Sequence, residues 1–268
     1  MKKVNLFLLV LAIFMASCGT TRTVPVTGRK QNLVVSDEQM LSLSTQQYNE
    51  YMKKAKKSTN TANTAMVQRV GKKLATAVET YLKHNGLANE LSGYKWEFNL
   101  VKDNSVNAFC MPGGKIVVYE GLLPVTKNET ALAIVLGHEI AHAVAKHSAE
   151  QLSKQYKQQV GMQIGSAVLS AAGMGANTSS LLEWATSQGL QLRNLKYSRD
   201  HENEADHMGL IFAAMAGYNP NEAVTFWQRM AAASGGSSSD FLSDHPSDAK
   251  RVENIKGWMP EALKYYKK

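Results

Sequence analysis

The sequence lacks three features that would each have indicated a different class of protein. No apolar run reaches the roughly 20 residues needed to cross a bilayer: the candidates cover only residues 6–15 and 161–174, and glycines interrupt the second. No internal repeat is present. The formal charge of +8 is spread along the chain, without the compact basic run and interleaved aromatics that indicate a nucleic-acid partner. That charge does favour contact with anionic lipid surfaces.

Cysteine is scarce, which makes Cys18 informative. It is one of only two cysteines in 268 residues, and it follows small residues at the end of a short apolar run that two lysines precede, as in a secretory signal. A cysteine in this place resembles the bacterial lipoprotein box, which implies removal of residues 1–17 and lipidation of Cys18; the alternative is a plain signal peptide. Lipidation would leave Cys110 without a disulfide partner, so we expect Cys110 to be packed near a turn. Residues 18–35 show little periodicity and predict a lipidated tether that lifts the domain off the membrane.

Residues 137–146 contain a His-Glu-x-x-His motif. On a helix, His138 and His142 lie about 40° apart around the axis and one turn apart along it, so both imidazoles can bind one zinc ion. Glu139 lies about 100° round from His138, where its carboxylate can reach a metal-bound water as a general base. The alternatives are a chance match on an exposed helix face and a closed structural zinc site.

The motif is predicted to lie within one helix over residues 126–155. Thr126 and Glu129 fit a capping box, and an apolar run follows. Gly137 is the one breaker in this stretch and costs about 1 kcal/mol relative to alanine, so it indicates either close approach by another backbone segment or a tolerated residue. Four further histidines lack ligand spacing and are interpreted as surface residues or as outer residues of the site: His84, His147, His201 and His207. His147 in particular is expected to face away from the motif pair.

A second polar stretch, residues 197–209, predicts the start of another helix. Glu202 and Asp206 are four residues apart and share a face, whereas Glu204 points away from them. A glutamate ligand followed one turn later by an aspartate fits an arrangement in which Asp206 orients a ligand histidine through its free ring N–H. The alternative is a solvated acidic helix start that the helix dipole stabilises.

With these motifs in place, the sequence resembles the HtpX-like zinc metallopeptidases, metallopeptidase family forty-eight. The resemblance covers nearly all of the chain after the signal segment and depends on five ordered segments: 107–114, 118–123, 138–142, 202–206 and 245–251. It implies that Glu202 is the third ligand of a gluzincin-type site holding one Zn²⁺ per chain. It also implies that His245 and Arg251 lie in the catalytic cleft, where they could meet the negative charge of a tetrahedral intermediate. In some relatives the histidine equivalent to His245 instead binds zinc as a fourth ligand and silences the enzyme.

The periodicities predict an α+β domain, rich in helix, with a small β-sheet beside the zinc helix. Strand patterns occupy residues 94–101 and 115–120, and helical patterns occupy residues 36–57, 63–83, 126–155, 203–216 and 220–233. If one strand is a sheet edge above the zinc helix, an extended peptide can add to it through backbone hydrogen bonds. We then expect Asn107, Gly113 and Gly114 to contact the substrate. The alternative is an ordinary sheet packed on the core.

The sequence as a whole is interpreted as a zinc metallopeptidase domain over residues 36–268, and residues 160–192 as either a mobile plug over the cleft or a buried helical hairpin. The function expected is a zinc endopeptidase that hydrolyses misfolded or damaged proteins of the bacterial cell envelope. Lipidated Cys18 would hold it at the membrane; no acidic retention signal follows, which favours the outer membrane facing the periplasm. The competing hypothesis is a chaperone-like or regulatory lipoprotein whose zinc site is closed.

Overall fold

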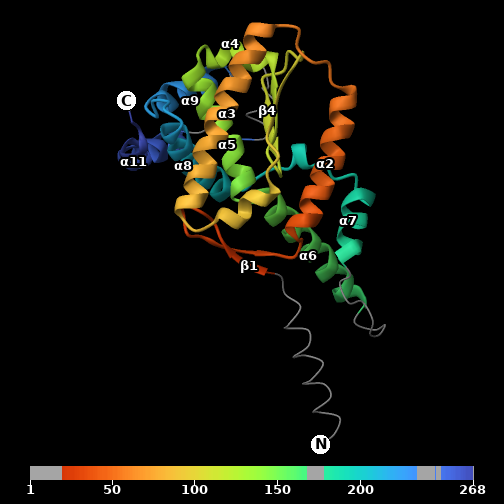
Figure 1. Ribbon diagram of the computed structural model, residues 1–268. Coiled ribbons are helices and arrows are strands. Elements are labelled where there is room, and N and C mark those ends of the chain that lie inside the picture. Colours follow the sequence, from red (N-terminus) through yellow and green to blue (C-terminus); the bar gives the residue numbers. More distant parts are fainter. Residues whose placement is uncertain (1–19, 168–177, 234–244, 246–248, 268) are drawn as a thin grey trace, which may run out of the picture.

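The computed structural model describes residues 20–167, 178–233, 245 and 249–267. Helices pack around a small three-stranded sheet, so the predicted helix-rich α+β class is confirmed (Figure 1). The helices are α2 (Asp37–Lys54), α3 (Thr61–His84), η1 (Ala88–Gly93), η2 (Glu120–Leu122), α4 (Leu123–Thr126), α5 (Glu129–Val144), α6 (His147–Ala167), α7 (Thr178–Ser187), η3 (Leu192–Asn194), α8 (Arg199–Met215), α9 (Glu222–Ala233) and α11 (Ala249–Tyr265). Across the described ranges, no helix is both long and apolar enough to span a membrane.

The three-stranded sheet lies between α2 on one side and α3 and α5 on the other (Figure 1). Its strands follow the order β3 (Glu97–Val101), β5 (Lys115–Tyr119) and β4 (Ala108–Met111). Strand β3 is parallel to the central strand β5, and β4 is antiparallel to it. The two strands predicted from the sequence correspond to β3 and β5, and β5 is not an edge.

Strand β4 was not expected. Its side chains alternate between two cores: Ala108 and Cys110 pack with residues of α3, α5 and α8, whereas Phe109 and Met111 pack against α2. All four residues are buried, so the strand shows no alternation of apolar and polar residues. Cys110 therefore lies in the core on the side of α5, near a turn as expected.

Helices α5 and α8 cross with their backbones in close approach. A Cβ atom added to Gly137 would lie 2.8 Å from the carbonyl oxygen of Gly209, and one added to Gly209 would lie 2.8 Å from the amide nitrogen of His138. Of the two interpretations of Gly137, the structure supports close approach by another segment. Glycine has no side chain, so these two residues allow α8 to approach α5 closely. At this separation α8 can present its acidic side chains to the histidines of α5.

The N-terminus of α5 differs from the predicted capping box. The cap is Asn128, whose side-chain oxygen accepts a hydrogen bond from the amide of Ala131 at 2.8 Å. Thr126 ends the preceding helix α4 instead, and its hydroxyl donates to the carbonyl oxygen of Leu123. Asparagine is as good an N-cap residue as threonine, so the sequence allowed either position.

The single helix predicted over residues 126–155 is wrong, because the chain breaks between α5 and α6. Lys146 adopts a left-handed conformation with φ of 56°, which ends α5 and starts α6 in a new direction. The Lys146 ammonium group pairs with Asp37 at 2.9 Å and with Glu90 at 2.5 Å. The sequence has no glycine or proline at this break, so it gives no signal that the helix ends there. The structure shows tertiary ion pairs at the same residue.

The N-terminal tether predicted for residues 18–35 is also corrected by the structure. Strands β1 (Thr20–Thr23) and β2 (Lys30–Leu33) form an antiparallel hairpin, and β2 packs against α6. Val24, Leu33 and Val35 are buried. The hairpin, not a tether, therefore joins the described part of the N-terminal segment to the domain.

Residues 160–192 lie partly outside the described residues. The described part of α7 and the turn after it pack against α2 and the β2 segment through Ala185 and Leu192. Helix α11 was not predicted, and its residues Ile255 and Ala262 are fully buried in the main core. Cys18 lies outside the described residues.

Candidate metal centre

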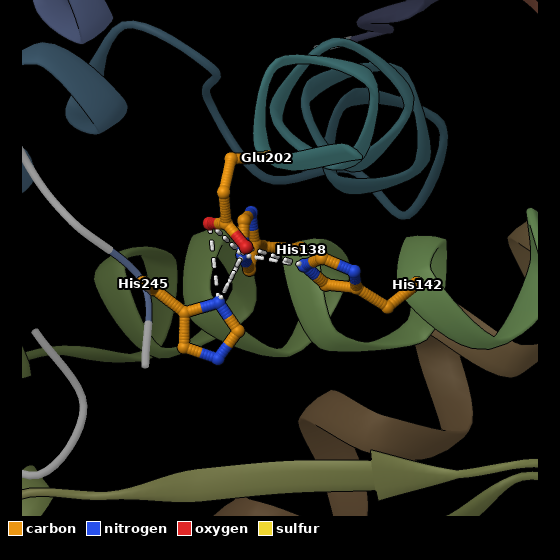
Figure 2. A group of neighbouring side chains, drawn as sticks. All are labelled: His138, His142, Glu202 and His245. Atoms are coloured by element: carbon orange, nitrogen blue, oxygen red, sulfur yellow. Dashed lines mark hydrogen bonds and ion pairs between the residues drawn. The ribbon is translucent and has the colours of Figure 1, made fainter. Parts of the chain in front are cut away.

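Four buried side chains from distant parts of the sequence meet at one point. His138 and His142 come from α5, Glu202 comes from the first turn of α8, and His245 precedes α11 (Figure 2). One possible ligand atom of each residue lies within 4.8 Å of those of the other three. The structure thus brings together the two motif histidines, the glutamate and the histidine that the family resemblance assigned to this site.

The spacing of these atoms fits a tetrahedral zinc ion. His138 Nε2 lies 3.1 Å from His142 Nε2 and 3.4 Å from Glu202 Oε2, and His245 Nδ1 lies 3.2 Å from His138 Nε2. Ligands at zinc bond lengths of about 2.0–2.1 Å stand about 3.3 Å apart at the corners of a tetrahedron. Imidazole nitrogens and a carboxylate oxygen are also the donor types that zinc prefers.

Glu139 contributes a buried carboxylate beside the ligands. Its Oε1 atom has no hydrogen-bond partner within the part of the chain that the structure describes, and His245 Nε2 lies 3.5 Å from it. A buried oxygen without a hydrogen bond is costly unless something other than the polypeptide satisfies it. A metal-bound water fits this requirement. Burial raises the pKa of Glu139, although His245 and His138 oppose the shift.

The charges of the metal-free site favour a cation. Burial alone would raise the pKa of Glu202, but the charge on His245 and hydrogen bonds with His138 and His142 hold it well below its usual range. Burial would lower the pKa of His138, but hydrogen bonds with Asp206 and Glu202 raise it to about 9. Burial keeps the pKa of His142 well below its usual value, so this ring is neutral. A metal ion at this point would therefore displace the proton of His138.

Asp206 holds His138 in place as the helical spacing predicted. Its Oδ1 lies 2.9 Å from His138 Nδ1, on the side of the ring opposite the ligand atom. Arg251 donates two hydrogen bonds to Asp206, Nε to Oδ2 at 2.7 Å and Nη2 to Oδ1 at 2.8 Å, and its guanidinium lies 3.4 Å from the centre of the Trp227 ring. Arg251 is thus buried behind His138. Its Nη1 also donates to the carbonyl oxygen of His245 at 3.3 Å and lies 3.6 Å from Glu202 Oε2, so it lies beside two of the candidate ligands.

Comparison with known proteins agrees with this geometry. Residues 61–259 match the family described as Peptidase family M48. The chain belongs to this family. The predicted resemblance to family forty-eight is therefore confirmed, although the HtpX-like label is only approximate.

The M48 chain is similar to several named metallopeptidases. It is 36% identical over 187 residues to the mitochondrial metalloendopeptidase OMA1 of Schizosaccharomyces pombe, covering 69% of this chain and 53% of that protein. It is 31% identical over 245 residues to the human metalloendopeptidase OMA1, covering 90% and 46%. It is 29% identical over 177 residues to the metalloprotease LoiP of Escherichia coli, covering 65% and 67%. The chain spans about half the length of the two OMA1 relatives.

The M48 domain supports His142 through His147, one of the histidines interpreted from the sequence as surface residues or as outer residues of the site. His147 is fully buried, and its Nδ1 lies 2.8 Å from His142 Nδ1. Its Nε2 lies 2.9 Å from Glu204 Oε2. The expectation that His147 faces away from the pair was wrong because it assumed an unbroken helix. Burial lowers the pKa of His147 to about 4, although Glu204 opposes the shift, so this ring is neutral.

Other aromatic groups surround the same ring. Tyr197 stacks on His142 with ring centroids 4.2 Å apart, and His201 stacks on His147 at 4.3 Å. His207 lies away from the centre against Trp258 and Glu261. His84 is exposed. The spacing of residues along one helix cannot reveal these roles, because the stacking partners come from α6, α8 and the segment before α8.

The three residues predicted to contact substrate lie in different places. Gly113 lines a cavity of about 190 Å³ that His142, Met40 and Tyr94 also line. Gly114 has a φ of 80°, and a Cβ atom there would lie 2.4 Å from the Trp96 ring, so this glycine is required by the packing of the turn.

Asn107 lies at the start of β4. Its side-chain oxygen accepts a hydrogen bond from the amide of Ala108, and its carbonyl oxygen accepts one from Tyr119. In antiparallel pairs, residues alternate between facing the partner strand and facing outward. Because Asn107 bonds to β5, the backbone groups of Ala108 and Cys110 point to the outer side of the sheet. Strand β4 is thus a sheet edge beside α5, and η3 lies against it.

Proposed function

We propose that this chain is a zinc-dependent endopeptidase of the bacterial cell envelope. The observation that carries the proposal is the convergence of His138, His142 and Glu202 beside a buried oxygen of Glu139 that has no hydrogen-bond partner among the described residues. A zinc ion bound there would polarise the scissile carbonyl and lower the pKa of a bound water to about 7. Membership of Peptidase family M48 and relatives named as metalloendopeptidases support this activity.

Glu139 is the general base of the proposed reaction. It takes a proton from the attacking water and returns it to the leaving amine, and its raised pKa brings it closer to the neutral range in which a general base is most effective. Asp206 and Arg251 keep the ring of His138 oriented during this exchange. No covalent intermediate is needed, so the buried Cys110 has no nucleophilic role.

His245 makes the proposed enzyme latent. Its Nδ1 lies 3.0 Å and 3.1 Å from the two carboxylate oxygens of Glu202, in the position of a fourth ligand. A catalytic zinc site keeps one position open for water or substrate. His245 must therefore move away before turnover, after which its imidazole can stabilise negative charge on the tetrahedral intermediate.

The proposed substrates are unfolded or misassembled envelope proteins. An extended segment can add to the β4 edge through backbone hydrogen bonds, which favours unfolded chains over a particular sequence. Because η3 lies against that edge and Gln47 holds it there by hydrogen bonds to Leu190 and Leu192, substrate entry also requires this segment to shift. The metalloprotease LoiP of Escherichia coli is a bacterial relative of this chain.

The proposed anchor is the lipidated Cys18, which holds the chain at the outer membrane facing the periplasm. The hairpin begins at Thr20, only two residues later. With no long tether between them, the hairpin end of the domain would lie at the lipid surface. The first residue after the modified cysteine would be Gly19, which carries no acidic retention signal.

A second function is a chaperone-like or regulatory lipoprotein whose zinc serves stability. The observation that favours it is the fourth ligand position taken by His245. In this alternative the centre stays closed and the chain binds unfolded proteins without cleaving them.

Zinc content and cleavage of casein by the full chain in detergent separate these functions. The peptidase proposal expects one zinc per chain in wild type, Glu139→Gln and His245→Ala. It expects cleavage by wild type or His245→Ala, and a rate at least about 100-fold lower in Glu139→Gln, the usual contribution of a general base. A gain in His245→Ala would support latency. Stoichiometric zinc without cleavage by any variant would contradict the peptidase and favour the alternative.

A further inference from the structure

A second polar cluster, partly buried, lies behind His142, on the side away from the ligand point. It contains two acids, two histidines and one arginine, which come from the N-terminal hairpin, α6 and α8: Arg29, His147, Glu150, His201 and Glu204. The proposed reaction does not use these residues.

The hydrogen bonds of this cluster have a defined direction if His142 binds a metal through Nε2. Nε2, which lies 3.4 Å from Glu202 Oε1, would then give its lone pair to the metal and carry no proton, so the proton of the neutral ring would be on Nδ1. His142 Nδ1 then donates to His147 Nδ1 at 2.8 Å. His147 carries its own proton on Nε2 and donates it to Glu204 at 2.9 Å. His147 thus fixes the orientation of His142 as Asp206 fixes that of His138.

Arg29 holds the far end of this chain of hydrogen bonds. Its Nε and Nη2 donate to Glu204 Oε2 at 2.9 Å and 2.8 Å, while its Nη1 and Nη2 donate to the two oxygens of Glu150 at 2.8 Å and 2.7 Å. The hydroxyl of Thr27 also donates to Glu204. A planar guanidinium that bridges two carboxylates in this way is geometrically specific, and lysine cannot reproduce it.

The hairpin turn is shaped to present Arg29. The amide of Val24 donates to the carbonyl oxygen of Arg29 at 2.8 Å, which closes the turn, and Val26 and Gly28 have positive φ values of 66° and 70°. Val24 is buried in the main core. The position of Arg29 is therefore fixed at both ends of the residue. The core holds the backbone of the turn, and the two acids hold the guanidinium.

We propose that Arg29 is a positioning residue of the metal centre, which makes the hairpin over residues 20–33 part of the zinc site. It acts through Glu204 and His147 on the ring of His142. The inference rests on the proposed zinc site, and it adds a requirement: the centre needs the N-terminal hairpin in place to bind the metal at full strength.

The test compares Arg29→Ala with Lys30→Ala in the full chain in detergent. Lys30 is the next residue of the hairpin, is exposed, and loses the same charge. The dissociation constant for zinc is measured by competition with a chromogenic chelator, and the coordination geometry by the visible spectrum of the cobalt-loaded chain. We expect Arg29→Ala to weaken zinc binding about 10-fold, the lower end of the effect of outer ligand supports. The cobalt spectrum should shift, and Lys30→Ala should match wild type in both measurements.

Two further variants keep the test decisive. Arg29→Lys retains the charge without the fork and should recover only part of the affinity. If circular dichroism shows that Arg29→Ala does not fold, Glu204→Gln replaces it, since glutamine keeps the shape and loses the charge; it should weaken zinc binding to a similar degree. Wild-type affinity and an unchanged cobalt spectrum in the folded variants would overturn this inference while leaving the proposed enzyme intact. Failure of wild type to bind zinc would overturn both.

Discussion

His138 and His142 lie one turn apart on α5, yet the molecule supports their rings in different ways. His138 contacts Asp206 directly, and Arg251 packs behind that aspartate from α11, so its support consists of regular helices. His142 depends on His147, which follows a left-handed break at Lys146, and beyond it on a hairpin turn. The comparison teaches that neighbouring ligands of one metal can differ in how directly the rest of the fold holds them. We expect the His138 side to be the more costly to disturb.

Asp206→Asn tests the His138 side and should have the largest effect. It keeps the shape of the side chain but removes the carboxylate charge that accepts two hydrogen bonds from the buried Arg251, and breaking a buried pair costs about 3–5 kcal/mol. Zinc affinity should fall about 10- to 100-fold. Urea unfolding and chelator competition measure the two effects. Asp200→Asn, an exposed change on the same helix, should behave as wild type. If Asp206→Asn weakened zinc binding less than Arg29→Ala does, the His142 side would be the more costly to disturb, contrary to our expectation.

Gly137→Ala tests the crossing on which both sides depend. The added Cβ atom would lie 2.8 Å from the carbonyl oxygen of Gly209, so the helices must move apart, at a cost of about 1–3 kcal/mol for overpacking. Zinc affinity should fall as well, because Glu202 moves with α8. Gly257→Ala in α11 is the matched control, since a Cβ atom there meets nothing within 4 Å. It should raise the free energy of unfolding by about 0.5–1 kcal/mol. Equal effects of the two changes would show that the crossing is not tight.

Acid titration of the His142 side should give the smallest effect. Burial would raise the pKa of Glu150, but His201 and Arg29 hold it at about 2, below the ordinary value of 4.5. A lowered pKa stabilises the fold fully above pH 4.5, and the contribution disappears as the pH falls from 4.5 towards 2. Glu150→Gln should therefore be less stable than wild type by about 1 kcal/mol at pH 6, a typical value for a partly exposed charged pair.

The free energies of unfolding of wild type and Glu150→Gln should become more similar as the pH falls towards 3. Urea unfolding of the metal-free chain at pH 6 and pH 3 measures this difference. If the difference in free energy of unfolding were the same at pH 6 and pH 3, the charge of Glu150 would not contribute to the stability of the fold.

The two sides also differ in what the sequence could predict. Asp206 and Glu202 follow the period of a helix, so their shared face was expected, and it is the face that meets α5. His245 and Arg251 were assigned only through the family resemblance, since they are far from the motif in sequence. The predicted fold class and family are confirmed.

The His142 side escaped prediction for physical reasons. The break at Lys146 has no glycine or proline, because tertiary ion pairs accompany the left-handed residue. Strand β2 buries the polar Gln31 together with Leu33, so no apolar alternation marks it. Arg29 is an ordinary surface residue by its sequence, and only the fold shows that it bridges the buried Glu204 and the partly buried Glu150.

The most direct measurement is X-ray absorption spectroscopy of the zinc-loaded full chain, compared with His245→Ala. The account predicts a first shell of nitrogen and oxygen atoms at about 2.0–2.1 Å, with three imidazoles in wild type and two in His245→Ala. A sulfur atom at about 2.3 Å, which would have to come from a cysteine, or a shell with fewer than two imidazoles would contradict the proposed centre.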